Sequence, residues 1–219
     1  MELQKNIFAG QTAVTIITRK NGIPLTVRNN RMRFFFADEY MAFYDKLKPK
    51  QRITFHFLIQ TGGRINECRH VKVSDIDFNR NSLIFRVTKS RNKDGSVRPR
   101  IIPISSQFVK YLKTYIVEHD LKTDDTFNIL STPAANIAMK KALQLAGIDD
   151  WKMFSVHNVR KTFETWLLAL DIDSIKVIKH VGHSVGMAIQ HYVSSDTFSY
   201  EDKQMIRSII GDLYTPMKY

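Results

Sequence analysis

Four separate segments of this 219-residue chain hold charged and polar side chains that an ordinary helical core would not require. In chain order they are Thr61-Gly-Gly-Arg64, Lys89 near a turn, His157-Asn-Val-Arg160, and Gly182-His183-Ser with Tyr192 nine residues after the histidine. Arginine has a fork of charged donors that matches phosphate oxygens, histidine can relay a proton, and tyrosine can act as a nucleophile. Together these residue types could bind a phosphate group and break one of its ester bonds.

Breaking a phosphodiester requires a nucleophile, neutralisation of the charge that develops on the non-bridging oxygens, and a proton for the departing oxygen. Tyr192 could supply the nucleophile, but the unperturbed tyrosine pKa of about 10 means that nearby cations or a base must help it to ionise. Arg64 and Arg160 could neutralise the phosphate. Arg64 and Glu67 are three residues apart, so they share one helix face and Glu67 can hold Arg64 in place.

Each motif taken alone has a simpler interpretation. An isolated Arg–Glu pair on a helix is usually a surface ion pair, and a lysine in a hairpin loop is usually solvated. A histidine at a helix start can be a neutral capping or core residue, and a single tyrosine is usually buried with its hydroxyl satisfied. The joint occurrence of the motifs in this order is what favours a chemical role.

Composition points to a polyanionic partner. The chain has 33 Lys and Arg against 21 Asp and Glu, a net charge of +12 and a pI near 9.8. Residues 64–100 hold ten of the basic residues and four acids, so this segment carries a net charge of about +6, half of the total. This charge could form a phosphate-binding surface, or it could belong to an ordinary solvated hairpin. The longest apolar runs fall far short of the roughly 20 residues that a membrane-spanning helix needs.

Cysteine usage and the amino terminus suggest a cytoplasmic protein without a metal or a membrane anchor. Cys68 is the single cysteine, so it cannot form an internal disulfide, and we expect it to be a small buried side chain. No Cys/His cluster has the spacing of metal ligands. The amino terminus lacks the basic start and long apolar stretch of a signal peptide.

Hydrophobic periodicity predicts an α+β domain that is mostly helical with a small antiparallel sheet. Helices are expected at 40–47 with Asp38 as the cap, 53–60, 64–71, 107–117, 134–146, 156–170 with Ser155 as the cap, 174–181, 187–193 and 198–213. Strand pairs are expected at 13–17 with 24–27, and at 82–89 with 97–104. With 43% apolar residues, the chain can bury one sizeable core.

The ordered set of motifs closely resembles the active site of the tyrosine recombinases, the phage-integrase family. The resemblance covers residues from about 31 to 213. It implies the DNA breaking-rejoining catalytic fold in residues 31–219, with a tail helix at 198–213, after a short extension formed by residues 1–30. It also implies a site-specific recombinase or integrase that works through a covalent 3′-phosphotyrosyl intermediate and needs neither ATP, nor a metal, nor another cofactor.

The resemblance also assigns roles to individual residues. They are Tyr192 as nucleophile, Arg64 and Arg160 as phosphate clamp, Lys89 as general acid for the 5′ oxygen, His157 as acceptor or relay of the tyrosine proton, His183 as hydrogen-bond donor to a non-bridging oxygen, and Glu67 as support for Arg64. We further expect DNA contacts from Arg91, Lys93, Arg98 and Arg100.

The partners that the resemblance implies are double-stranded DNA carrying attachment or recombination sites, and further copies of the chain. We expect a homo-oligomer on DNA, a tetramer in the synaptic complex, and no membrane partner. Such a protein would be cytoplasmic and associated with the nucleoid, and a virus, plasmid or other mobile element could encode it.

The chain departs from the family pattern at three points. Relatives usually carry a separate helical DNA-binding domain before the catalytic one, whereas only residues 1–30 precede the pattern here. Either the chain is an excised or processed domain, or it is a minimal enzyme whose amino-terminal hairpin partly replaces the missing half. Gly63 stands where many relatives have a larger apolar residue, and Val181 stands where leucine is common.

Other functions remain open at this point. A type IB topoisomerase resembles recombinases in fold and catalytic residues, although the short chain and the interval between His183 and Tyr192 are more typical of integrases. A catalytically silent DNA-binding module of the same fold would not need all six catalytic residues. A metal-dependent nuclease would need a carboxylate cluster.

Overall fold

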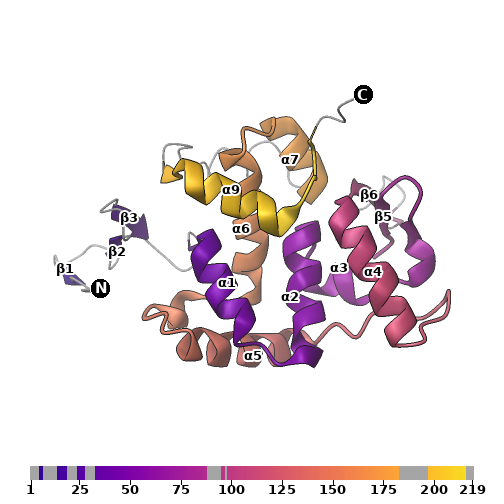
Figure 1. Cartoon of the computed structure of the whole chain (residues 1–219), viewed down its shortest axis with the longest axis horizontal. Coiled ribbons are helices and arrows are strands. Elements are labelled where there is room, and N and C mark those ends of the chain that lie inside the picture. Colours follow the sequence, from indigo (N-terminus) through magenta and orange to yellow (C-terminus); the bar gives the residue numbers. More distant parts are fainter. Residues whose placement is uncertain are drawn as a thin grey trace.

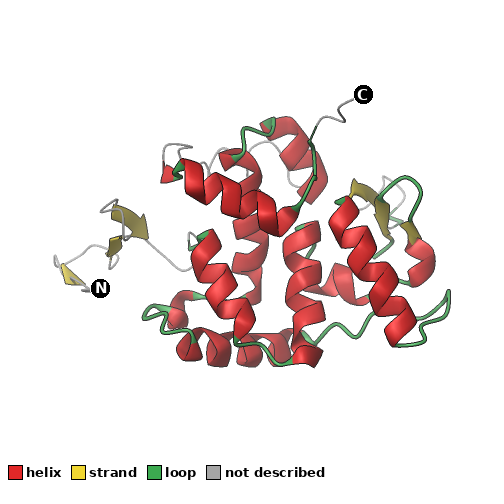
Figure 2. Cartoon of the chain, in the orientation of Figure 1, coloured by secondary structure: helices red, strands yellow, loops and turns green. Residues whose placement is uncertain are grey.

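The computed structural model describes residues 5–6, 14–18, 24–27, 33–87, 95–96, 98–182 and 197–215. Within these residues, helices predominate and the strands form two small antiparallel sheets (Figures 1 and 2). The predicted α+β class, mostly helical with a small sheet, is confirmed. None of the helices in the described ranges is long and apolar enough to cross a membrane.

The helices follow the predicted segments closely. They are α1 (Ala37–Asp45), α2 (Pro49–Thr61), α3 (Ile65–Arg69), α4 (Ser106–Glu118), α5 (Thr132–Leu145), α6 (Val156–Ala169), α7 (Ser174–Val181) and α9 (Tyr200–Ile210), with short 3-10 segments at Val73–Asp75 and Trp151–Met153. The tail helix is shorter than expected because it ends at Gly211, whose φ of 69° leaves the helical region. The helix expected at 187–193 lies outside the described residues.

Both predicted strand pairs form, although the described strands of the second pair are shorter than the predicted 82–89 and 97–104. β2 (Val14–Thr18) pairs with β3 (Pro24–Val27) and also with β1 (Lys5–Asn6), which was not expected. The second sheet has the order β4-β5-β6, formed by β4 (Ile76–Asp77), β5 (Ser82–Phe85) and β6 (Arg100–Pro103). Its register pairs Phe85 with Arg100, so the chain leaves β5 and returns to β6 at one end of the sheet.

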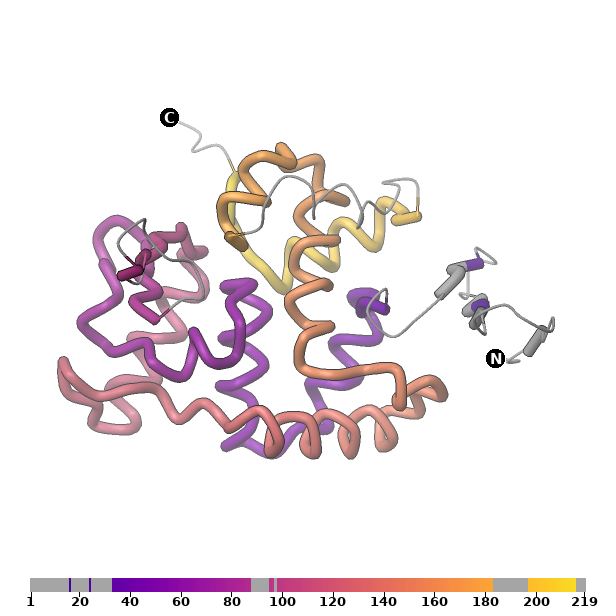
Figure 3. The backbone as a smooth tube through the Cα atoms, turned by 180° about the vertical axis from the view of Figure 1, so that it is seen from behind, coloured from indigo at the N-terminus to yellow at the C-terminus, as the bar shows by residue number. Residues whose placement is uncertain are grey.

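Helix α6 is the centre of the helical body. It packs against α2, α5, α7 and α9, and Figure 3 shows it running from α5 at the bottom of the view to α7 at the top. Val159, Phe163, Trp166 and Leu167 on α6 are all completely buried. Trp166 also donates a hydrogen bond of 2.9 Å from Nε1 to the carbonyl of Phe35, so the buried indole N–H is satisfied. The catalytic motif predicted at the start of α6 therefore sits on a helix that packs against four others.

Several helix starts differ from the prediction. Asp38 was wrongly expected to cap α1, which instead begins earlier, with Phe36 at the N-cap. The Glu39 carboxylate accepts a hydrogen bond from the Phe36 N–H at 2.9 Å, so a side chain inside the first turn replaces the expected cap. Arg64 likewise occupies the N-cap of α3 and not its first turn. Ser155 is the N-cap of α6, as predicted.

A buried ion cluster fixes the chain as it approaches α1. The Arg33 side chain is fully buried, and its guanidinium pairs with Asp150 at 2.7 Å and with Glu39 at 2.6 Å. It also lies 4.5 Å from the ring centroid of Phe154. Removing one partner of a buried pair leaves an uncompensated charge out of water, which costs more than the pair contributes when intact.

We therefore expect Arg33→Met to lower the free energy of unfolding by about 3 kcal/mol or more, because Asp150 would remain buried without its cation. Arg80→Met is the control, since Arg80 pairs with Asp77 at an exposed site and should change stability by less than about 1 kcal/mol. Urea denaturation followed by circular dichroism would measure both. Equal losses in the two variants would contradict this account of Arg33.

Candidate active site

The turn between α2 and α3 brings the first predicted motif onto α6. Gly62 ends α2 with a left-handed φ of 57°, and a Cβ at this position would collide with the ring of Phe163 on α6. Glycine is therefore required both for the backbone conformation and for the close approach. A Cβ at Gly63 would in turn collide with Phe85 and with the sulfur of Cys68. Phe85 thus occupies space that a larger residue at position 63 would fill.

Arg64 and Glu67 form the pair that their spacing predicts. Arg64 Nη1 donates to Glu67 Oε1 at 2.9 Å, and the Arg64 backbone N–H donates to Oε2 at 2.9 Å. The Glu67 side chain is 3% exposed, whereas the Arg64 side chain is 23% exposed. The carboxylate is therefore a buried support, and the guanidinium that it holds still reaches solvent.

A second arginine shares the Glu67 carboxylate. Arg100 Nη2 donates to Glu67 Oε2 at 2.9 Å, and the side chain of Arg100 is only 12% exposed. Burial would by itself raise the pKa of Glu67, but Arg100, together with the N–H and the guanidinium of Arg64, lowers this pKa below its usual value. Glu67 is therefore ionised at neutral pH and balances one of the two flanking charges.

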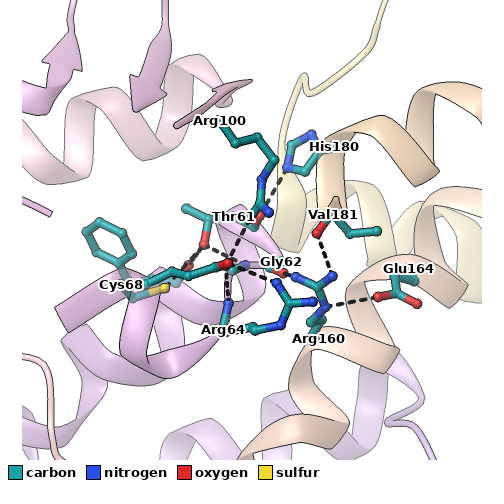
Figure 4. Close-up of polar contacts among 12 residues, drawn as sticks. Thr61, Gly62, Arg64, Cys68, Arg100, Arg160, Glu164, His180 and Val181 are labelled. Carbon is teal, nitrogen blue, oxygen red and sulfur yellow. Dashed lines mark hydrogen bonds and ion pairs between the residues drawn. The ribbon is translucent and has the colours of Figure 1, made fainter. Parts of the chain in front are cut away.

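Arg160 is held in place by backbone carbonyls from two other segments. Its Nη1 donates to the carbonyl of Gly62 at 2.9 Å and its Nη2 to that of Val181 at 2.5 Å, while Nε lies 3.2 Å from Glu164 Oε1 (Figure 4). Burial lowers the pKa of Arg160 to about 10, although Glu164 opposes this shift and Arg64 adds to it. The guanidinium thus stays charged at neutral pH while it connects α6 to the end of α2 and the end of α7.

Sequence reasoning missed His180, which ties the same turn to the carboxyl-terminal segment. Its Nε2 lies 3.0 Å from the carbonyl of Thr61 and its Nδ1 lies 2.8 Å from the hydroxyl of Tyr214. A carbonyl can only accept, so Nε2 carries the proton and Nδ1 accepts from the Tyr214 hydroxyl. Burial lowers the pKa of His180 to about 3, so the imidazole is neutral. The only sequence signal was its place beside Val181 on the apolar face of α7.

The remaining predicted residues fall into two groups. His157 lies exposed in the first turn of α6, whereas Arg160, one turn later, is buried. Arg98 is exposed just before β6. The predicted residues outside the described ranges are Lys89, Arg91, Lys93, His183 and Tyr192.

Cys68 is completely buried below the turn, and burial raises the pKa of its thiol to about 12. The predicted buried, unreactive cysteine is therefore confirmed.

The described part of the site carries excess positive charge. Arg64, Arg100 and Arg160 point toward one another in Figure 4, and the carboxylates of Glu67 and Glu164 balance two of the three charges. Charges interact more strongly here than in water because most of these groups are buried. The arrangement can bind an anion with charged, preoriented donors.

Comparison with known proteins identifies the family. The family model described as "Phage integrase family" matches residues 30–198, and the chain belongs to this family. A probable integrase/recombinase of Acholeplasma phage L2 is 29% identical over an alignment of 188 residues that covers 73% of this chain and 61% of the relative. Tyrosine recombinase XerA of Thermococcus onnurineus is 26% identical over an alignment of 145 residues that covers 63% of this chain and 48% of the relative. The chain thus spans roughly half to three fifths of the length of these relatives.

Solved structures show the same fold. The crystal structure of XerA recombinase superimposes with a TM-score of 0.58 at 19% identity, covering 85% of this chain and 65% of that one. The Tn1549 transposon integrase, solved in complex with transposon right end DNA, gives a TM-score of 0.58 at 16% identity and covers 81% of this chain and 65% of that one. The predicted tyrosine recombinase fold is therefore confirmed.

The buried, neutral His180 predicts a specific pH dependence. In the unfolded chain a histidine has a pKa of about 6.5 and binds a proton that the folded His180, with a pKa of about 3, does not bind. The contribution of the neutral His180 to the free energy of unfolding is therefore complete above pH 6.5. It is lost as the pH falls toward 3, by up to about 1.4 kcal/mol per pH unit. His56, whose pKa burial lowers to about 4, adds to the same trend.

We expect His180→Gln to flatten this loss between pH 6.5 and 4, because the amide can make both hydrogen bonds without titrating. His70→Gln, at an exposed position, should keep the wild-type slope. Free energies of unfolding from urea titrations at several pH values would decide. A wild-type slope in the His180 variant would show that another group controls the acid sensitivity.

Proposed function

We propose that this chain is the catalytic part of a site-specific tyrosine recombinase, an enzyme that cleaves and rejoins DNA strands through a 3′-phosphotyrosyl bond. The observation that carries the proposal is the arginine cluster at the α2–α3 turn of a phage-integrase family member. Its three guanidinium groups face two carboxylates, so one positive charge is left for an anion. A phosphodiester has the charge and the acceptor geometry for this cluster.

Arg64 and Arg160 would bind the non-bridging oxygens of the scissile phosphate. Arg64 has an exposed edge, and Glu67 restrains it from the buried side. Arg160 is held by two carbonyls before any substrate arrives, so little reorganisation is needed when charge develops in the transition state. Support for the assignment comes from this preorganisation and from the family pattern around both residues.

Tyr192 would attack the phosphorus atom, so that the bond from its oxygen to phosphorus forms while the bond from phosphorus to the 5′ oxygen breaks. His157 would accept or relay the phenol proton, Lys89 would protonate the departing 5′ oxygen, and His183 would donate a hydrogen bond to a non-bridging oxygen. A 5′-hydroxyl from another strand would reverse the attack and release the tyrosine. Because the phosphotyrosyl bond keeps the energy of the original ester, neither ATP nor a metal enters these steps.

The proposed partner is double-stranded DNA that carries recombination or attachment sites. Solved relatives include the Tn1549 integrase with transposon DNA, XerH bound to a difH substrate, and a lambda integrase dimer bound to a core site. The net charge of +12 suits a DNA partner, and Arg91, Lys93 and Arg98 would contribute contacts from the basic stretch at residues 64–100. On such DNA we propose a homo-oligomer, a tetramer in the synaptic complex.

The similarity to a phage recombinase favours an origin in a virus, plasmid or other mobile element, and the place of action would be the nucleoid in the cytoplasm. Residues 31–219 would form the catalytic domain and residues 1–30 a short extension. Contacts of Arg33 with Asp150 support a domain start before Arg33.

The test is capture of the covalent adduct. We would incubate the protein in EDTA with a pool of end-labelled, nicked duplexes of randomised sequence, from which the cleaved flank is lost, and separate the products on a denaturing gel. We expect a labelled protein–DNA adduct with the wild type and none with Tyr192→Phe, since phenylalanine lacks the attacking oxygen. Tyr200→Phe is the matched control, because Tyr200 is 74% exposed on α9 and should leave adduct formation unchanged.

The other outcomes separate the alternative functions. Tight DNA binding without an adduct would contradict the proposal and indicate a catalytically silent DNA-binding module. An adduct that requires a divalent metal would indicate a nuclease. An adduct accompanied by relaxation of supercoiled plasmid, without exchange between paired captured sites, would indicate a type IB topoisomerase.

A further inference from the structure

Arg100 was expected to contact DNA, yet its side chain turns into the arginine cluster. It opens strand β6, and its Nη2 bonds to Glu67 Oε2, the same oxygen that receives the backbone N–H of Arg64. Glu67 Oε1 receives Nη1 of Arg64. The single carboxylate therefore holds Arg64 from one side and Arg100 from the other, and the side chain of Arg100 keeps only 12% of its surface exposed.

Two further residues lie against the Arg100 guanidinium. Its central carbon lies 5.0 Å from the centroid of the Phe85 ring, on the partner strand β5. On the opposite element, a Cβ at Gly182 would collide with Nη1 of Arg100. Gly182 adopts a left-handed φ of 70° at the end of α7, directly before His183. The glycine thus leaves room for Arg100 to pass between the sheet and α7.

The Nε of Arg100 is buried and has no hydrogen-bond acceptor among the described residues, and a buried donor that is left unsatisfied costs free energy. Three elements nevertheless converge on this one side chain, namely β5, α3 and the end of α7. In the sequence, β5 leads to Lys89, α3 carries Glu67 close to Arg64, and the end of α7 precedes His183.

We infer that Arg100 is a positioning residue of the proposed reaction, holding Glu67 and through it Arg64 while fixing the β5–β6 strand pair against the end of α7. The inference rests on the proposed function. Lysine could keep the charge but has neither the planar face for Phe85 nor several donors in one plane. Without Arg100, the buried Glu67 would keep only Arg64 as a cation, and Arg64 would lose its fixed support.

The first experiment separates positioning from direct DNA contact. For the wild type, Arg100→Met and Arg100→Lys, we would measure the dissociation constant for captured duplex by fluorescence anisotropy and the single-turnover rate of adduct formation at saturating DNA. We expect Arg100→Met to lower the rate by about tenfold to a hundredfold, because misplaced catalytic groups cost rates of this order, with the dissociation constant within about threefold of wild type. Arg100→Lys should fall between the two.

Matched arginine variants calibrate these effects. Arg80→Met removes the same charge from an exposed turn of the basic stretch and should leave the adduct rate unchanged. Arg98→Met removes an exposed charge two residues before Arg100 and should weaken DNA binding and its salt dependence. If Arg100→Met instead weakens binding as Arg98→Met does, with its rate at saturation unchanged, Arg100 is an ordinary DNA contact and the inference is overturned.

A second measurement does not depend on catalysis. Carbon-13 NMR of the labelled glutamate carboxyl groups would follow the titration of Glu67, assigned with Glu67→Gln, in the wild type and in Arg100→Met. We expect the pKa of Glu67 to rise in the variant because burial would then be opposed by Arg64 alone. An unchanged pKa would overturn the inference. If the wild type itself forms no adduct, the proposed function fails, and this titration alone decides whether Arg100 holds Glu67.

Folding is checked by near-UV circular dichroism. If Arg100→Met does not fold, Arg100→Lys carries the same two measurements. A wild-type rate together with a wild-type Glu67 pKa in the folded lysine variant would then show that charge alone suffices, and the inferred role for the planar guanidinium would be rejected.

Discussion

Two successive carbonyls at the end of α2 hold the site together. The carbonyl of Thr61 receives a hydrogen bond from His180 on α7, and that of Gly62 receives one from Arg160 on α6. A helix end leaves its last carbonyls without partners in its own helix, and here they are satisfied by side chains from elements more than ninety residues away in sequence. The geometry of the arginine cluster therefore depends on backbone groups that every residue type provides, and on glycine at the one position where the turn needs a left-handed φ.

The site holds charge at a cost that the surrounding carboxylates only partly offset. Burial disfavours a guanidinium, and Arg160 accordingly has a lowered pKa, yet a pKa of about 10 still keeps it charged. Glu67 and Glu164 each face a guanidinium without cancelling the total. A site of this kind is least favourable when empty and improves when an anion enters, which is the property expected of a centre that stabilises a negatively charged transition state.

Sequence patterns were sufficient where interactions are local. The spacing of Arg64 and Glu67 predicted their pair, and periodicity located all the described α-helices but not the short 3-10 segments, because the pair and the α-helical pattern both depend on residues three or four apart. The orientation of Arg100 depends on how β6 packs against the α2–α3 turn, and the role of His180 depends on how α7 packs against it. Both elements are distant from this turn in the sequence, so periodicity could not predict these contacts. The prediction that Asp38 caps α1 was wrong for a local reason, because Glu39, one residue later, accepts the hydrogen bond at the start of this helix.

The buried Arg33 cluster has a consequence for how the chain can be divided. Arg33 reaches Asp150 across 117 residues, and Phe34, Phe35 and Phe36 beside it are almost fully buried. A fragment cut at the first helical residue, Ala37, would lose these three aromatic side chains, expose the apolar surface that they cover, and leave Asp150 in the interior without its cation. The packing of the helical body thus begins before its first helix, at a buried side chain in a segment that is neither helix nor strand.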